Sequence, residues 1–168
     1  FLSGHLHVQH CKRSEDNRGI WEMVTASLAT PSCKYAILTY RDDRSFLYRT
    51  QSLDVEAWAK KNQRTEEDLL NFKQFQTPFL RRVFYNQAIA ALNEVPELTD
   101  SEREQMAQLY SLLKFHYYQG TAYQVQEPVR NDPAYELWQE DGMATQQGEY
   151  FRYILEDGKR DYNRLEVN

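Results

Sequence analysis

Apolar residues follow strand-like spacing at the start of the chain and helical spacing after it. Up to Leu53 they form short runs, which predict strands at residues 1–2, 20–24, 35–40 and 45–51. The charged residues 41–44 predict a hairpin turn between the last two runs. Within residues 35–40 both alternating sets of side chains are largely apolar, which is typical of a sheet covered on each face.

After Leu53 the apolar residues recur every three or four positions, as on the buried face of a helix. The predicted helices are a short one ending near Asn62, a run over residues 69–92 broken near Pro78, one over residues 99–120, and a last one over residues 146–157, with helix starts at Thr65 and at Thr99 or Asp100. Gly142 and Gly148 flank a polar stretch that predicts a mobile loop. We therefore expect an α+β chain, with strands in residues 1–53 and a helical extension in residues 54–168.

The residues with the clearest chemistry are the two histidines of the sequence Gly4-His5-Leu6-His7. In an extended segment, side chains two positions apart project to the same side, so both imidazoles can face one site. Neutral imidazole is a ligand for zinc, iron, manganese and nickel. A His-x-His pair recurs by chance in many proteins, so its meaning depends on the residues that follow it.

The pair is followed by a polar stretch, an apolar stretch from Ile20 to Leu28, then Pro31 and a Tyr-led strand at residues 35–40. This order resembles the C-terminal end of the calcineurin-like metallophosphoesterases, in which Gly-His-x-His is the last metal motif. The resemblance is strongest over residues 1–53. Residues 132–163 are similar to helical extensions of some bacterial members of that family.

The resemblance implies a hydrolase that cleaves phosphate mono- or diesters at a dinuclear metal site. His5 and His7 would each bind one of two divalent ions, manganese, iron or zinc, which together activate a bridging water. His10 is a candidate for the rim of the cleft, although a role in a surface loop is favoured for it. The implied fold is the terminal strands of a four-layer α/β/β/α sandwich, followed by a mainly helical subdomain that packs on or caps the substrate site.

The other metal motifs of that family, Asp-x-His, Gly-Asp-x-x-Asp and Gly-Asn-His-Asp/Glu, do not occur after Phe1. The chain is therefore expected to be a C-terminal fragment that is inactive alone and carries no identifiable catalytic residue beyond the metal ligands. Its expected partners are the N-terminal part of the same protein and a phosphoester substrate, either a small molecule or a phosphoprotein.

Composition narrows the function only a little. A net charge of -5 argues against a nucleic-acid-binding surface, because binding a phosphate backbone requires a basic face. No apolar run approaches the roughly 18 residues that span a bilayer. Cys11 and Cys33 are expected to be free thiols, and they leave the compartment open between cytoplasmic and exported.

Two other hypotheses compete with the enzyme. One is a non-enzymatic helical interaction module in which the histidine pair is incidental. The other is a structural zinc site, which neither cysteine supports by its spacing. Among the helical residues, Phe72, Phe75 and Phe79 are expected to be core rather than a cofactor site, and His116 is expected to be buried or interfacial rather than a ligand.

Overall fold

The computed structural model describes residues 1–15, 19–30 and 32–167, so Pro31 of the sequence motif lies outside it. The strands are β1 (Leu2–Ser3), β2 (His10–Arg13), β3 (Trp21–Val24), β4 (Lys34–Tyr40), β5 (Phe46–Ser52) and β6 (Arg164–Val167). The α-helices are α1 (Val55–Lys61), α2 (Glu67–Leu70), α3 (Phe72–Leu92), α4 (Asp100–Tyr118), α5 (Gln126–Arg130), α6 (Ala134–Gln139) and α7 (Gln146–Asp157). Two short 3₁₀ helices, η1 (Ala122–Gln124) and η2 (Asp141–Ala144), complete them. The α+β class is confirmed.

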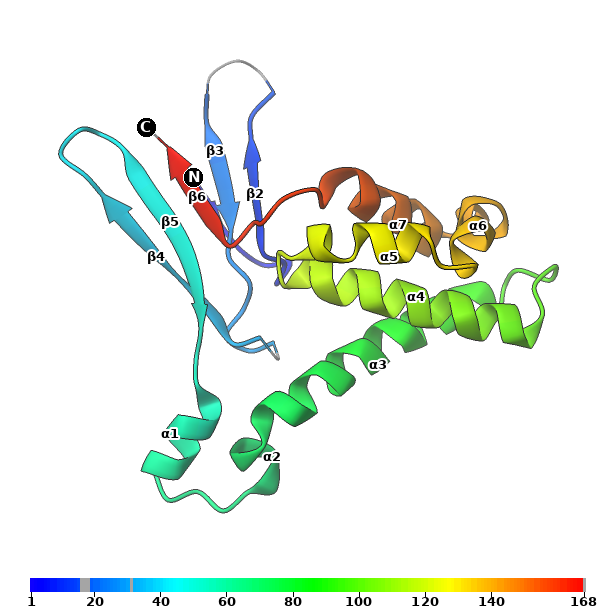
Figure 1. The fold of residues 1–168 in the computed structure, drawn as a ribbon, viewed down its shortest axis with the longest axis horizontal. Helices are drawn as coiled ribbons and strands as arrows, with labels where there is room; N and C mark the ends of the chain where they lie inside the picture. Colours follow the sequence, from blue (N-terminus) through cyan, green and yellow to red (C-terminus); the bar gives the residue numbers. More distant parts are fainter. Residues whose placement is uncertain (16–18, 31, 168) are drawn as a thin grey trace. The chain divides into compact units, whose positions relative to one another are not determined.

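The strands form two three-stranded sheets (Figure 1). In the first, β3 lies between β1, to which it is parallel, and β2, to which it is antiparallel. In the second, β5 lies between β4 and β6 and is antiparallel to both. The described residues do not show the four-layer sandwich that the sequence predicted.

Backbone contacts divide the chain into two compact units. The sheet unit comprises residues 1–79, 118–120 and 162–168, and the helical unit comprises residues 80–117 and 121–161. The sheet unit has a core shared by both sheets, formed by Cys11, Met23, Tyr48, Tyr162 and Leu165. Because Tyr162 and Leu165 come from the end of the chain, this core depends on both ends of the sequence.

The core of the helical unit is built on large aromatic side chains. Trp138 and Phe151 are fully buried, and Trp138 Nε1 donates to the carbonyl of Met106 at 2.9 Å. That bond satisfies the polar edge of an otherwise apolar ring, which is the usual condition for burying tryptophan. Met106, Tyr110 and other residues of α4 line the same core.

Local signals account for where several helices begin. The predicted helix start at Thr99 is confirmed: Thr99 Oγ1 accepts from the amide of Glu102, and Glu102 Oε2 accepts from the amide of Thr99 at 2.7 Å. This is a capping box, which satisfies two amides that lack partners in the helix. Asp54 caps α1 and Thr145 caps α7 through their side chains. The N-cap of α2 is Glu66 rather than the predicted Thr65.

Two predicted features differ in the structure because tertiary packing overrides local signals. α3 runs unbroken through Pro78, with its buried residues Leu80, Phe84, Ala88 and Leu92 at four-residue spacing after the proline. The predicted loop between Gly142 and Gly148 is instead η2 and the first turn of α7. A Cβ on Gly148 would lie 2.0 Å from the carbonyl oxygen of Gly142, so both glycines are needed for close packing.

Candidate functional site

His5 and His7 lie in an exposed segment between β1 and β2. Both adopt left-handed backbone conformations, with φ of 82° at His5 and 57° at His7. The extended geometry expected for the pair is therefore wrong, and the rule that alternate side chains share a side does not apply to it. A left-handed conformation costs a non-glycine residue about 1–2 kcal/mol, so the surrounding structure must hold this segment in place.

The two ends of this segment are fastened to neighbouring residues after β3. The amide of Thr25 donates to the carbonyl of Ser3 at 3.4 Å, just before the histidines. The amide of Ala26 donates to Gln9 Oε1 at 3.3 Å, just after them. Since Thr25 and Ala26 are adjacent, these bonds close residues 3–9 into a loop, which we call the histidine loop.

Gln9 is the buried base of the histidine loop. Its side chain is fully buried, and Nε2 donates to the carbonyl of Tyr162 at 2.8 Å and to Tyr48 Oη at 3.1 Å. Its backbone amide donates to the carbonyl of Tyr118 at 3.2 Å. The hydroxyls of Tyr48 and Thr25 lie 2.9 Å apart and extend this network, and burial raises the pKa of Tyr48. Gln9 thus ties the loop to β5, to the segment that precedes β6 and to the end of α4.

A second polar cluster fixes residues 118–120 in the sheet unit. Lys34 Nζ donates to the carbonyl of Gln119 at 2.6 Å and to Asn163 Oδ1 at 2.5 Å. Asn163 Oδ1 also accepts from Thr50 Oγ1 at 2.6 Å, while its Nδ2 donates to the carbonyl of Gln119 at 3.0 Å. Gly120 has φ of +71°, and a Cβ there would lie 2.7 Å from Gln9 Cγ. Only glycine fits this position without displacing Gln9.

His10 lies in β2 rather than in a surface loop. Its side chain is buried, with its ring 4.3 Å from that of Tyr162 between centroids. The buried Cys11 follows it, and both Cys11 and Cys33 are free thiols. The positions of the cysteines give no support to a structural zinc site.

Among the described residues, no group of three or more histidine, cysteine or acidic side chains is placed to hold a metal ion. The prediction of metal binding at a dinuclear site is therefore corrected, since the described residues form no such site. His5 and His7 supply two imidazoles, whereas a site for two ions needs several more ligands, including a bridging carboxylate. This part of the chain does not itself provide them.

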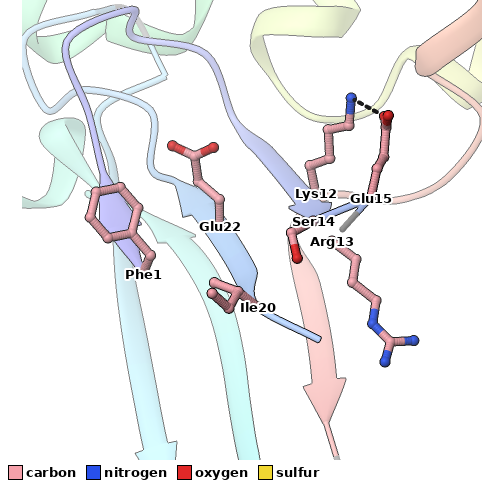
Figure 2. A pocket seen from close by; sticks show the side chains of 7 residues that line it. All are labelled: Phe1, Lys12, Arg13, Ser14, Glu15, Ile20 and Glu22. Carbon is pink, nitrogen blue, oxygen red and sulfur yellow. Dashed lines mark ion pairs between the residues drawn. The ribbon is translucent and has the colours of Figure 1, made fainter. Parts of the chain in front are cut away.

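An open hollow of about 530 Å³ lies beside β2 and β3 (Figure 2). It is lined by Phe1, Lys12, Arg13, Ser14, Glu15, Ile20 and Glu22. Lys12 Nζ forms an ion pair with Glu15 at 3.0 Å, and Glu22 Oε1 accepts a hydrogen bond from Ser3. Two cationic and two acidic side chains offset each other, so charge gives this hollow no preference for a phosphate.

Lys114 is a buried ionisable group of the helical unit. Its Nζ donates to Gln87 Oε1 at 2.8 Å and to Tyr110 Oη at 3.0 Å. It also lies about 5 Å from the ring centroids of Phe84, Tyr110 and Tyr150. Burial lowers the pKa of Lys114 to about 8, because the aromatic surroundings replace only part of the hydration of the ammonium.

His116 is half-buried, as expected, and it contacts protein groups rather than a ligand cluster. Its Nδ1 lies 3.1 Å from Thr121 Oγ1. Burial lowers the pKa of His116, and the charge of Arg81 lowers it further. Phe75 and Phe79 differ from the expectation, since their side chains are 46% and 52% exposed instead of forming core.

Comparison with known families decides which family this helical region represents. A family model described as the C-terminal domain of cyclic nucleotide phosphodiesterase matches residues 54–161, nearly two thirds of the chain. The chain belongs to this family. No curated protein matches the chain. Membership relates the chain to phosphodiesterases. No helix among the described residues is both long and apolar enough to cross a membrane.

The match corrects the family predicted from sequence. What it supports is the C-terminal domain of cyclic nucleotide phosphodiesterase, and the assignments to the calcineurin-like metallophosphoesterases and to a dinuclear metal enzyme are replaced. The earlier assignment depended on four residues, Gly4 to His7, and on a short strand pattern, which carry much less information than a match along the whole helical region.

Gln9 and Lys114 are among the buried polar residues that sequence reasoning missed. The partners of Gln9 are Tyr48 and Tyr162, which lie 39 and 153 positions away. From the sequence alone, Lys114 in α4 looks like an ordinary exposed basic residue. A short segment of sequence gives no signal for either, because the partners are assembled only by the fold.

Proposed function

We propose that this chain is the C-terminal region of an enzyme that hydrolyses a phosphodiester bond of a cyclic nucleotide. The observation that carries the proposal is the family match over residues 54–161. The domain's description names the reaction class and the substrate class, which narrows the earlier expectation of phosphate mono- or diesters. The other groups that the reaction needs would come from the part of the whole protein outside this chain, so the chain alone is expected to be inactive.

His5 and His7 are the residues of this chain proposed to reach the substrate site. They are exposed, they lie on a loop held at both ends, and imidazole is a side chain that commonly binds metal ions or transfers protons in catalysis. The helical unit then has a packing or capping role. Its titratable residues Lys114 and His116 are engaged with neighbouring side chains and are not part of this proposal.

The test is hydrolysis of 3′,5′-cyclic AMP and 2′,3′-cyclic AMP by the whole protein that contains this chain. We expect His5→Ala and His7→Ala each to lower kcat/KM by at least 100-fold. His116→Gln is the matched control and should remain within threefold of the parent protein, because His116 lies in the helical unit. Full activity in both loop variants would refute the role of His5 and His7. If the parent protein hydrolyses neither nucleotide, the proposed activity is refuted.

Whether His5 and His7 bind metal ions can be tested on the same preparations. Metal content per chain would be measured for the parent protein, His5→Ala and His7→Ala. Loss of bound metal in the variants, together with loss of activity, would give the imidazoles a ligand role. Unchanged metal content with lost activity would instead favour proton transfer or direct contact with the phosphate.

A second candidate function is a non-catalytic interaction module. The observation in its favour is a set of half-exposed apolar side chains in the sheet unit, namely Leu53, Trp58, Phe75 and Phe79. A contiguous exposed apolar patch is typical of a surface that binds another protein, and we propose that these four side chains belong to one such patch. Sedimentation of the parent protein and of Phe79→Glu tests this function, because loss of an association in the variant without loss of hydrolysis would assign these residues to binding alone.

A further inference from the structure

The histidine loop has its two ends fastened by different kinds of bond. At its first end, the amide of Thr25 donates to the backbone carbonyl of Ser3, a contact that any side chain at these positions permits. At its second end, the amide of Ala26 donates to the side chain of Gln9. The second fastening is therefore specific to the residue at position 9, and a single substitution can remove it.

The amide group suits this position because it must donate and accept at once. Nε2 faces two acceptors, the carbonyl of Tyr162 and Tyr48 Oη, while Oε1 faces the amide of Ala26. Methionine has nearly the same shape but forms none of these bonds. An ionised glutamate accepts from Ala26 but places a negative charge against the carbonyl of Tyr162.

The loop that Gln9 holds contains two of the five non-glycine residues with positive φ among those described, His5 and His7. Strained backbone persists only where neighbouring contacts over-determine it. Gln9 is two positions beyond His7, and its side chain and backbone amide together reach Ala26, Tyr48, Tyr118 and Tyr162. Releasing the side chain would allow residues 5–8 to relax toward ordinary backbone conformations and would displace both imidazoles.

We propose that Gln9 is a positioning residue that holds His5 and His7 in their functional arrangement. The inference rests on the proposed function of the two histidines. Gln9 itself is fully buried, so the proposal gives it no contact with the substrate. Its removal should therefore lower kcat and leave KM nearly unchanged, since misplaced imidazoles weaken the reaction step more than binding of the nucleotide.

The first experiment compares Gln9→Met with Gln126→Met in the whole protein. Gln126 is the matched control because its Nε2 also donates to a backbone carbonyl, that of Gly158 at 3.2 Å, and both of these residues belong to the helical unit. We expect kcat to fall at least tenfold in Gln9→Met with KM within twofold, and both constants to stay within twofold in Gln126→Met. Assays would be run below the unfolding midpoints of all variants.

Gln9→Glu keeps the inference testable if Gln9→Met does not fold. A protonated carboxyl has one donor and one acceptor, so it can replace the amide between Ala26 and Tyr162, whereas the ionised form cannot. Burial raises the pKa of a carboxyl, which brings this change toward neutral pH. The activity of Gln9→Glu relative to the parent protein should therefore rise as pH falls from 8 to 6, and a constant ratio would overturn the inference.

The imidazole resonances of His5 and His7 give a readout that does not depend on activity. In NMR spectra of histidine-labelled protein, Gln9→Met should shift both resonances, and Gln126→Met should shift neither. Unmoved resonances, or full kcat in Gln9→Met when His5→Ala is inactive, would overturn the positioning role while the proposed function stands. Full activity of His5→Ala and His7→Ala would instead remove the function on which the inference rests.

Discussion

The indole of Trp138 stacks on the ring of Phe151, with centroids 5.1 Å apart and planes inclined by 14°. The two residues belong to α6 and α7, so the stack joins the short helix to the longer one that follows it. Both side chains are fully buried. The pair therefore contributes two large buried rings to the core of the helical unit.

Phe151→Ala should destabilise the helical unit by about 3–5 kcal/mol, because it removes a buried ring and leaves a cavity beside Trp138. Urea unfolding followed by circular dichroism at 222 nm measures the change. Tyr123→Ala, at a side chain that is 39% exposed, is the control and should cost less than about 1 kcal/mol. Equal losses in the two variants would show that the stack contributes little.

Because of Lys114, the free energy of unfolding should rise with pH in the alkaline range. Its pKa is about 8 in the folded chain and 10.5 ordinarily. Between these values the unfolded chain binds a proton that the folded chain does not, so the free energy of unfolding increases as pH rises from 8 to 10.5. Below pH 8 both states are protonated, and the cost of burying the charge is constant.

Lys114→Met tests this dependence. The variant should be more stable than the parent protein at pH 7, by on the order of 2 kcal/mol, because methionine fills the aromatic pocket without a buried charge. The difference should shrink toward pH 10 as the parent lysine loses its proton. Unfolding midpoints at pH 7, 8.5 and 10 measure it, and a difference independent of pH would exclude this origin.

How far the fold could be predicted depended on how local each signal was. The capping box at Thr99 lies within four residues, and the sequence predicts α4 together with a helix start at either Thr99 or Asp100. β6 was missed because four residues at the end of the chain become a strand only by pairing with β5, more than a hundred positions earlier. Phe75 and Phe79 were expected in the core because spacing reveals that a helix has an apolar face, but not whether another element covers that face.

The candidate site was predicted in residue type but not in geometry. His5 and His7 were identified from the motif, whereas their positive φ values depend on the bonds that close the histidine loop. Gln9 could not be identified, since its role depends on Tyr162 at the other end of the chain. Contacts of such long range carry no pattern that periodicity or spacing can detect.

Because of His116, the free energy of unfolding should fall in mild acid. Its pKa is lowered by burial and by the charge of Arg81, so the unfolded chain takes up a proton near pH 6.5 before the folded chain does. Stability conferred by the neutral imidazole is present above pH 6.5 and is lost as pH falls below it. His116→Gln should therefore reduce the difference in unfolding free energy between pH 7 and pH 5, and an unchanged difference would contradict the prediction.

Alanine substitutions at Gly120 and Gly19 distinguish the cost of backbone strain from the cost of steric crowding. Both have positive φ, +71° and +69°, so an alanine at either is strained by about 1 kcal/mol or more. A Cβ at Gly19 meets only Arg13 Nη2, at 3.5 Å, whereas one at Gly120 lies 2.7 Å from Gln9 Cγ.

Gly120→Ala should therefore lower the free energy of unfolding more than Gly19→Ala does, by about 1–3 kcal/mol, which is the usual cost of crowding a core. Urea unfolding measures this difference. Because the added methyl group pushes directly on Gln9, Gly120→Ala should also lower kcat for a cyclic nucleotide in the whole protein, while Gly19→Ala should leave it unchanged. If Gly120→Ala is destabilised but keeps the parent kcat, then the side chain of Gln9 can move without disturbing the two histidines, and the loop must be held by its backbone bonds alone.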